Sequence, residues 1–499
     1  MISPRRFGRV LVANRGEIAV RVMRACRTAG LESVAVYSDA DRDARHVALA
    51  DAAVEIGPAP AKESYLSIPK LLEAAKTAGC DAVHPGYGFL SENADFARAV
   101  TGAGLVWIGP PADAMEAMGS KISARKRMKA AGVPVVPGAL IGPFEEHEEK
   151  ISFKEISSLG FPVLVKASAG GGGKGMRVVH SPSDLSEAIS SCRREALAAF
   201  GDSTVYVEKY LSAPRHIEVQ ILGDTHGNVV ALGERECSLQ RRHQKVVEEC
   251  PSPAVSPELR ARLCQAAVEA ARAVAYVSVG TVEFLVEPSG AFWFLEMNTR
   301  LQVEHPVTEE AFSVDLVALQ LRIAAGERLP ELPAAPAFHA IEARVYAEDP
   351  DAEFLPQAGR LLVWIEPSGP GVRVDSGVIS GQAVDVHYDP MLAKIVAKGR
   401  TREEARRRLV VALRETVALG VTTNLSWLGR LLESDPVVRG ETHTGLLETL
   451  LLPALPPPPD EVLAAAASVL SGPACAAPGV TKSSWPGPFD TPFRMGNGA

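Results

Sequence analysis

The sequence FPVLVKASAGGGGKGMRVV, residues 161–179, places four consecutive glycines between two runs of β-forming residues. Its glycines match the pattern G-x-G-x-x-G formally, but no helix pattern follows them, so a dinucleotide-binding turn is not predicted here. A strand, a glycine loop and a second strand are typical of a flap whose backbone N–H groups close on phosphate oxygens, with Lys166 and Lys174 adding positive charge. The alternative is a plain flexible hairpin loop.

On the N-terminal side of this flap, short apolar runs alternate with helix patterns from residue 9 to about residue 120. Residues 10–13 read as a strand, residues 18–29 as a helix and residues 33–37 as a second strand, which is the pattern of a parallel α/β unit. The turn after the first strand has one glycine, so the NAD fingerprint is missing. We therefore predict a scaffold domain that carries substrate loops.

On the C-terminal side, two strand patterns flank the turn Pro288-Ser289-Gly290. The simplest register opposes Glu283 to Phe294 and places Glu283 diagonal to Glu296, and alternation adds Asn298 to the same face. Two carboxylates and an amide oxygen are hard ligands of the kind that Mg²⁺ takes beside nucleotide phosphates. The alternative is an ordinary polar face of a hairpin, and a register change of one residue would alter the geometry.

The run NTRLQVEHPVTE, residues 298–309, follows this hairpin directly. It mixes arginine, glutamine, glutamate and histidine in an irregular order next to the predicted metal ligands. This neighbourhood favours a reactive site over a solvated polar face.

Composition sets outer limits on the function. The chain has 499 residues, 46% of them hydrophobic, with Lys+Arg 52 against Asp+Glu 60 and a net charge of −8, which argues against a general nucleic-acid binder. Its seven cysteines form no CxxC pair, which fits a reducing compartment. No apolar run approaches the roughly 18 residues of a membrane span. We expect a soluble, cytoplasmic protein.

The C-terminal third shows further strand patterns, such as residues 393–397, and a charged helix pattern over residues 401–419. Five prolines within residues 453–459 predict a stiff linker, followed by a tail rich in proline and glycine.

Four segments carry a resemblance to a known family: VANRGEIA at 12–19, HPGYGFLSEN at 84–93, QRRHQK at 240–245 and residues 296–309. On these segments the chain resembles biotin carboxylases of the ATP-grasp superfamily, from about residue 7 to residue 450. The resemblance implies an α/β and α+β fold, an ATP-grasp fold with a Rossmann-like (pre-ATP-grasp) N-terminal domain and a β-rich C-terminal domain. The implied domains are residues 1–120, 121–338 with a lid at about 138–210, 339–450, and a linker and tail at 451–499.

The resemblance also assigns roles to single residues. It implies ATP contacts at Lys121, Lys166, Gly172, Gly173, Glu208, Lys209, Tyr210, Leu211, His216, Gln240, His243, Glu283 and Glu296. It implies Mg²⁺ or Mn²⁺ ligands at Glu283, Glu296 and Asn298. It implies a bicarbonate site at Lys245, Arg300, Gln302 and the backbone of Val303, the general base Glu304, and a biotin site at Tyr87 and Arg344. Arg300 and Arg344 are also expected to act in catalysis.

The implied reaction joins bicarbonate to biotin at the expense of ATP, through carboxyphosphate. No Met-Lys-Met biotinylation motif occurs in the sequence, so the biotin is expected on a separate carrier protein. A carboxyltransferase partner and a homodimer are expected too, and residues 387–391 favour an acyl-CoA carboxylase, acting on acetyl-CoA or propionyl-CoA. Two alternatives stay open: an ATP-grasp ligase that hands its acyl phosphate to an amine, and a nucleotide-binding regulatory protein without activity.

Three residues or pairs have plainer interpretations as well. Arg241 and Arg242 could form a solvated basic face among glutamates at positions 234, 236, 248 and 249. Cys237 is expected to be a small buried residue and not a nucleophile. Tyr87 could serve packing alone.

Overall fold

The computed structural model of the chain describes residues 7–141, 156, 158–167, 176–201, 203–242, 244–453 and 460–464. Met1–Leu451 form one compact unit, and a second unit begins at Leu452. The glycines of the predicted flap, His243 and most of the proline-rich linker and tail lie outside the described residues.

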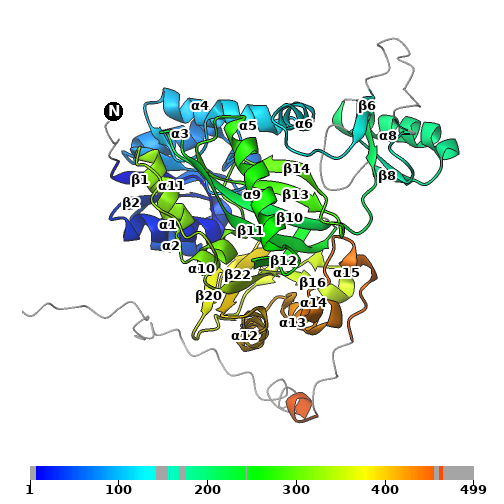
Figure 1. The fold of residues 1–499 in the computed structure, drawn as a ribbon. Coiled ribbons are helices and arrows are strands. Elements are labelled where there is room, and N and C mark those ends of the chain that lie inside the picture. Colours follow the sequence, from blue (N-terminus) through cyan, green and yellow to red (C-terminus); the bar gives the residue numbers. More distant parts are fainter. Residues whose placement is uncertain are drawn as a thin grey trace, which may run out of the picture. The chain divides into compact units, whose positions relative to one another are not determined.

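The N-terminal segment forms a five-stranded parallel sheet of order β3-β2-β1-β4-β5 (Figure 1). Its central strand β1 (Arg9–Val12) is followed by α1 (Gly16–Thr28), so the predicted alternation of strand and helix is confirmed. The remaining strands are β2 (Glu32–Ser38), β3 (Ala52–Gly57), β4 (Ala82–His84) and β5 (Val106–Trp107). Val10, Leu11 and Val12 are fully buried because both faces of a parallel sheet are covered.

An eight-stranded antiparallel sheet of order β14-β13-β10-β11-β12-β15-β22-β20 carries the rest of the unit. Its strands are β10 (Arg215–Gly223), β11 (Val229–Arg241), β12 (Gln244–Cys250), β13 (Ser278–Val286), β14 (Phe292–Asn298), β15 (His339–Tyr346), β20 (Val372–Ser376) and β22 (Met391–Gly399). The pairing of β12 with β15 makes the sheet continuous past residue 338. Helix α9 (Pro257–Arg272) covers β10, β11 and β13 with an alanine-rich face (Figure 1).

A smaller four-stranded sheet has the order β6-β9-β7-β8. It consists of β6 (Gly138–Ile141), β7 (Val163–Ala167), β8 (Met176–Val179) and β9 (Val205–Lys209), with α8 (Leu185–Phe200) packed on it. The predicted strands on either side of the glycine run are confirmed: β7 and β8 pair in an antiparallel register that brings Lys166 opposite Met176.

The predicted register of the β13–β14 hairpin is wrong. The Gly290 N–H donates to the Glu287 carbonyl at 2.9 Å, and Glu287 then pairs with Ala291, because Gly290 adds one residue to the turn at a φ of 79°. A second irregularity in β14 places Phe294 opposite Phe284 but Glu296 directly opposite Glu283. Each shift alone would move Glu296 to the opposite face of the sheet, and the two together restore it to the face of Glu283.

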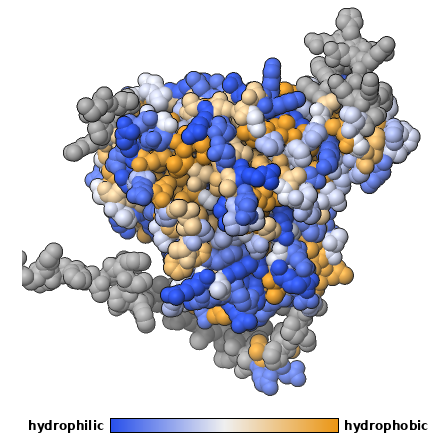
Figure 2. Space-filling view, viewed as in Figure 1, coloured by the Kyte–Doolittle hydropathy of each residue, from blue (hydrophilic) through white to orange (hydrophobic). Residues whose placement is uncertain are grey.

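The predicted helix over residues 401–419 is too long. Helix α12 (Arg402–Glu415) ends before Thr416, and β23 (Val417–Leu419) pairs with β19 (Val363–Ile365) instead. The β-branched residues Thr416 and Val417 suit an extended backbone better than a helix. Figure 2 shows hydrophilic side chains over the part of the surface that α12 occupies in Figure 1.

Candidate active site

Two neighbouring cavities lie against the eight-stranded sheet. The larger has a volume of about 1110 Å³ and the smaller about 490 Å³. Both are lined by Arg300, Val303, Arg344, Tyr346 and Asp389, so these residues form the border between them. Any chemistry that links a ligand in one cavity to a ligand in the other must pass this border.

The larger cavity gathers side chains to which the family resemblance assigns contacts with nucleotide, metal and bicarbonate, together with Arg344 from the implied biotin site. It is lined by Lys121, Lys166, Glu208, Lys209, Tyr210, Leu211, His216, Gln240, Lys245, Glu283, Glu296, Asn298, Arg300, Gln302, Val303, Glu304 and Arg344. Gly172, Gly173 and His243 lie outside the described residues. Residues more than 180 positions apart in sequence thus share one cavity, as the sequence hypothesis requires.

The side chains near the smaller sheet already form ion pairs. Lys166 Nζ lies 2.5 Å from Glu208, and Arg125 reaches the same carboxylate at 3.2 Å. Lys209 Nζ lies 3.2 Å from Glu287. Lys166 and Lys209 line the larger cavity, whose wall here suits an anionic ligand such as a polyphosphate.

Glu283 and Glu296 face each other across β13 and β14 at the other wall. Repulsion by Glu283, together with burial, raises the pKa of Glu296. Burial alone would raise the pKa of Glu283 too, but Lys245 and His216 hold it well below its ordinary value. The carboxylates of Glu283 and Glu296 offer hard oxygen ligands that suit a divalent cation such as Mg²⁺. A cation bound between them would relieve their mutual repulsion.

Asn298 belongs to the same face. Its amide nitrogen donates to Glu283 at 2.8 Å, and its amide oxygen accepts from Arg300 at 2.8 Å. That oxygen is the atom that would serve as a third ligand, and in this arrangement Arg300 occupies it.

Lys245, on β12, is shared by three carboxylates. Its Nζ lies 2.5 Å from Glu218, 3.0 Å from Glu283 and 2.6 Å from Glu304. Burial would lower the pKa of Lys245, but these three carboxylates raise it well above its ordinary value. The ammonium group therefore stays charged although it is largely buried, and it would attract an anion strongly because the effective dielectric constant there is low.

Glu304 lies between Lys245 and Arg344. Arg344 Nη2 lies 3.0 Å from Glu304 and 2.5 Å from Glu248. Burial would raise the pKa of Glu304, but Lys245, Arg344 and Arg235 hold it well below its ordinary value. Glu304 is thus ionised and able to accept a proton once a substrate takes over its cationic partners.

Sequence reasoning missed two further residues, Glu218, which forms an ion pair with Lys245, and Arg235, which donates a hydrogen bond to Gln302. The fully buried Arg235 forms an ion pair with Glu218 and donates to Gln302 at 2.7 Å, and Gln302 in turn donates to Glu283 at 2.7 Å. A signal was present for Glu218, because residues 216, 218 and 220 place polar side chains at period two between Ile217, Val219 and Ile221.

Glu92 was also missed, although it lies in a segment that carries the resemblance. Its carboxylate accepts from the Thr299 N–H at 2.9 Å and from Arg300 Nε at 2.9 Å. Glu92 therefore ties the loop of residues 299–304, here called the anion loop, to the N-terminal segment.

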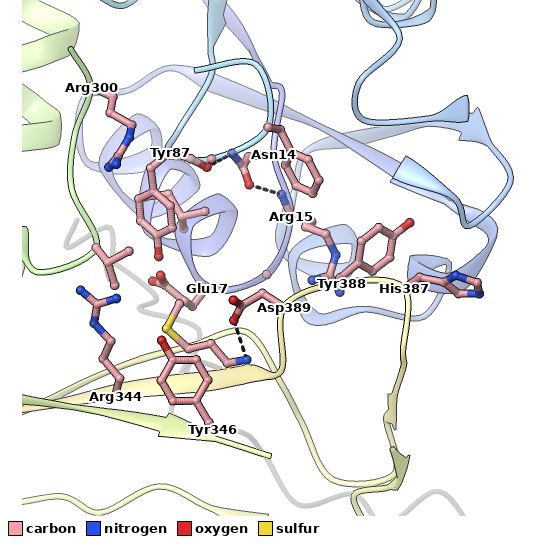
Figure 3. Close-up of a pocket in the computed structure, with 16 residues that line it drawn as sticks. Asn14, Arg15, Glu17, Tyr87, Arg300, Arg344, Tyr346, His387, Tyr388 and Asp389 are labelled. Atoms are coloured by element: carbon pink, nitrogen blue, oxygen red, sulfur yellow. Dashed lines mark hydrogen bonds between the residues drawn. The ribbon is translucent and has the colours of Figure 1, made fainter. Parts of the chain in front are cut away.

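Tyr87 and Arg344 both line the smaller cavity, with Glu17 and the segment His387 to Asp389 (Figure 3). The Tyr87 hydroxyl is buried, and no hydrogen-bond partner is recorded for it among the described residues. Packing alone leaves this hydroxyl unexplained, because a buried polar atom without a partner is costly.

The plainer interpretations have mixed outcomes. Arg241 pairs with Glu348 at 2.6 Å and lies over the Phe354 ring, so a solvated face is wrong for Arg241. Arg242 is exposed and pairs with Glu353 at 2.9 Å. Cys237 is buried as predicted, and burial raises the pKa of its thiol well above the ordinary value.

Three family models match successive parts of the chain. They are described as the biotin carboxylase N-terminal domain (residues 6–115), the carbamoyl-phosphate synthase L chain ATP-binding domain (residues 120–332) and the biotin carboxylase C-terminal domain (residues 342–449). In the part of the chain that the structure describes, no helix is long and apolar enough to cross a membrane.

Individual relatives agree with these matches. A biotin carboxylase of Haemophilus influenzae is 51% identical over 446 residues, covering 89% of this chain and 98% of its own. The mitochondrial methylcrotonoyl-CoA carboxylase subunit alpha of Dictyostelium discoideum is 49% identical over 90% of this chain, which spans only 65% of that longer relative. The solved biotin carboxylase domain of Hydrogenobacter thermophilus 2-oxoglutarate carboxylase superimposes with a TM-score of 0.81 at 42% identity, covering 89% of this chain and 97% of its own. With this fold, these cavities and these relatives, the chain belongs to the biotin carboxylase family, whose members are ATP-dependent ligases.

Proposed function

We propose that this chain uses ATP to activate bicarbonate and transfers the carboxyl group to biotin borne by a separate carrier protein. The observation that supports this most directly is the position of Glu304 in the larger cavity, where it lies between Lys245 and the border residue Arg344. A nucleotide and an inorganic anion fit the larger, cation-lined cavity. A cyclic urea fits the smaller one beside Tyr87 and Arg344.

In the first step, Lys245, Arg300, Gln302 and the Val303 backbone hold bicarbonate. Bicarbonate is a poor nucleophile, so Glu304 takes its proton while its oxygen attacks the γ-phosphorus of ATP. An O–P bond forms, the bond from the γ-phosphorus to the bridging oxygen breaks, and ADP leaves. The products are ADP and carboxyphosphate, and the surrounding cations stabilise the charge that develops on the phosphoryl oxygens.

Glu283, Glu296 and Asn298 would hold Mg²⁺ or Mn²⁺, and the solved Hydrogenobacter thermophilus domain contains MgADP and bicarbonate. A divalent ion supplies charge neutralisation of the phosphates when it is bound. This chain supplies the opposed carboxylates that bind and orient it.

In the second step, carboxyphosphate breaks down to CO₂ and phosphate in the larger cavity. The released phosphate takes the proton from biotin N1, and Arg344 stabilises the resulting ureido enolate, which attacks CO₂. Arg344 is suited to this because it is buried and its counter-ions Glu248 and Glu304 fix its direction.

The final acceptor depends on partner proteins. We propose a biotin carboxyl carrier protein and a carboxyltransferase subunit as partners, and an acyl-CoA such as acetyl-CoA or propionyl-CoA as acceptor. The names of relatives include a methylcrotonoyl-CoA carboxylase and a pyruvate carboxylase, so the carboxylation of biotin is the part that they share.

The test is ATP hydrolysis by the purified chain. We expect hydrolysis that depends on bicarbonate and increases with free biotin, and we expect Glu304→Gln to lower turnover by about 100-fold or more while ATP binding persists. A protein whose ATPase ignored both bicarbonate and biotin would contradict the proposed function. Unchanged turnover in Glu304→Gln would contradict only its role as base.

A further inference from the structure

Two buried cations lie next to each other on the eight-stranded sheet. Arg344 on β15 and Lys394 on β22 are direct Cα partners, so their side chains leave the same face. Lys394 is fully buried, and Arg344 is 8% exposed. Like charges in directly opposite positions are destabilising unless each has its own counter-charge, so this pair calls for an explanation.

Each cation holds one of two consecutive residues of the anion loop. Arg344 binds the Glu304 carboxylate at 3.0 Å, and Lys394 Nζ donates to the Val303 carbonyl at 2.8 Å. The pair therefore fixes the loop at two adjacent points, one on a side chain and one on the backbone.

Glu17, which lines the smaller cavity, supplies a counter-charge for Lys394. Its carboxylate lies 3.3 Å from Lys394 Nζ, and it belongs to the first turn of α1 in the N-terminal segment. The start of α1 has little room to move, since a Cβ at Gly377 would lie 2.5 Å from the backbone nitrogen of Glu17.

Lys394 also lies 5.7 Å from the centre of the Tyr87 ring, which lines the smaller cavity beside Glu17 (Figure 3). An ammonium group over an aromatic face is attracted to it. Lys394 thus contacts both the Val303 carbonyl in the anion loop and the Tyr87 ring in the smaller cavity.

We propose that Lys394 is a positioning residue, which with Glu17 holds the Val303 carbonyl and thereby fixes the backbone of the anion loop for bicarbonate. The inference rests on the proposed function. Lys394 itself is not placed among the side chains that line either cavity. It acts through Val303, as Glu92 acts through Thr299 and Arg300.

The test is a set of full-length variants assayed at pH 8. Burial raises the pKa of Glu17 to about 7, so a pH above that value is needed for Glu17 to be ionised. In Lys394→Met we expect the KM for bicarbonate to rise by about 10-fold to 100-fold, the usual cost of losing a residue that orients a direct ligand. The KM for ATP should change by less than about twofold. Lys394→Arg keeps a donor and should recover part of the loss, and Glu17→Gln should raise the same KM by a smaller factor.

Arg406→Met is the matched control. Arg406 is also a buried cation that donates to a backbone carbonyl, that of Leu432 at 2.9 Å, but it does so from α12, away from the anion loop. This variant should lower thermal stability without a selective change in the KM for bicarbonate.

The outcomes separate the two hypotheses. If the wild-type protein shows no bicarbonate-dependent ATPase, the proposed function fails and this inference falls with it. If the wild type is active, an unchanged KM for bicarbonate in Lys394→Met overturns the inference alone, as does an equal rise in both KM values. Should Lys394→Met fail to fold, Glu17→Gln decides, and its unchanged KM for bicarbonate overturns the positioning role.

Discussion

Some buried carboxylates in this protein form ion pairs with more than one cation, and these contacts determine the direction in which their pKa values shift. Glu309 is held by Arg21 and Arg373, each at 2.8 Å. Burial would raise the pKa of Glu309, but the two guanidinium groups lower it to about 2. Glu309 lies in helix α10 (His305–Phe312), which directly follows the anion loop.

We predict that the free energy of unfolding of Glu309→Gln depends less on pH below 4.5 than that of the wild type. The unfolded carboxyl titrates near 4.5 and the folded one near 2, so the unfolded state binds more protons between these values. The stabilisation is therefore complete above pH 4.5 and lost as the pH falls to 2, and it amounts to about 3 kcal/mol. Urea unfolding at several pH values measures it, and the gap between variant and wild type should narrow as the pH falls.

Glu403→Gln is the control for this measurement. The pKa of Glu403 is also lowered to about 2, chiefly by its hydrogen bond to Arg406, but its side chain is 42% exposed. Exposed ion pairs contribute about 1 kcal/mol or less because solvent screens them. A gap that widened with acid in Glu309→Gln would contradict the assigned pKa shift.

At the scale of elements, the β13–β14 hairpin shows what sequence could and could not provide. Alternation predicted that Glu283, Glu296 and Asn298 share a face. The register was wrong, because the turn glycine and the irregularity near Leu295 each add a residue, and no residue type there demands a bulge. The register of a hairpin is fixed by the length and type of its turn and by bulges, which the alternation of side chains does not reveal.

Directly opposed carboxylates lead to a prediction about this hairpin. Without metal, Glu296→Gln should stabilise the protein by about 0.5–1 kcal/mol, because like charges across a strand pair repel. The same change should reduce the rise in melting temperature that MgATP produces, since the protein loses a ligand. Thermal unfolding in EDTA and in MgATP measures both effects.

Glu287→Gln is the companion variant on the same hairpin. Glu287 faces Lys209 at 3.2 Å and accepts from Trp293 at 2.8 Å, so its loss should lower stability and leave the response to Mg²⁺ intact. If Glu296→Gln behaved like Glu287→Gln, the repulsion assigned to Glu296 would be contradicted.

Other elements mark the same limit of local reasoning. The strand and helix alternation at the N-terminus and the strands around the glycine run could be predicted, since their patterns are local. The end of α12 could not, because β23 is fixed by pairing with β19. Lys394 and Glu17 could not be singled out either, since their meaning depends on contacts between segments more than 80 residues apart.

At the scale of the whole molecule, the eight-stranded sheet joins the segments that line the larger and the smaller cavity. β12 carries Lys245, and its neighbour β15 carries Arg344. The N-terminal segment contributes Glu92, Tyr87 and Glu17 to the same region. The candidate site is therefore formed by the unit as a whole, and an isolated fragment would lack part of it.

We predict that the purified chain forms a homodimer. Sedimentation equilibrium should then give twice the chain mass of 52.9 kDa. The solved relative from Hydrogenobacter thermophilus is a dimer of its biotin carboxylase domain, which supports this expectation. A single species at the chain mass across micromolar concentrations would contradict it.

The contacts of Lys245 and Arg344 with Glu304 lead, under the proposed function, to an expectation about ATP hydrolysis in the absence of bicarbonate. A carboxylate gripped by two cations is a weak base, so until an anion arrives it has little power to activate water. Under the proposed function, an incoming bicarbonate would draw Lys245 towards itself and so raise the basicity of Glu304 once its target is in place. In the proposed mechanism, Glu304 therefore becomes an effective base only when bicarbonate is bound, which limits the unproductive hydrolysis of ATP by water.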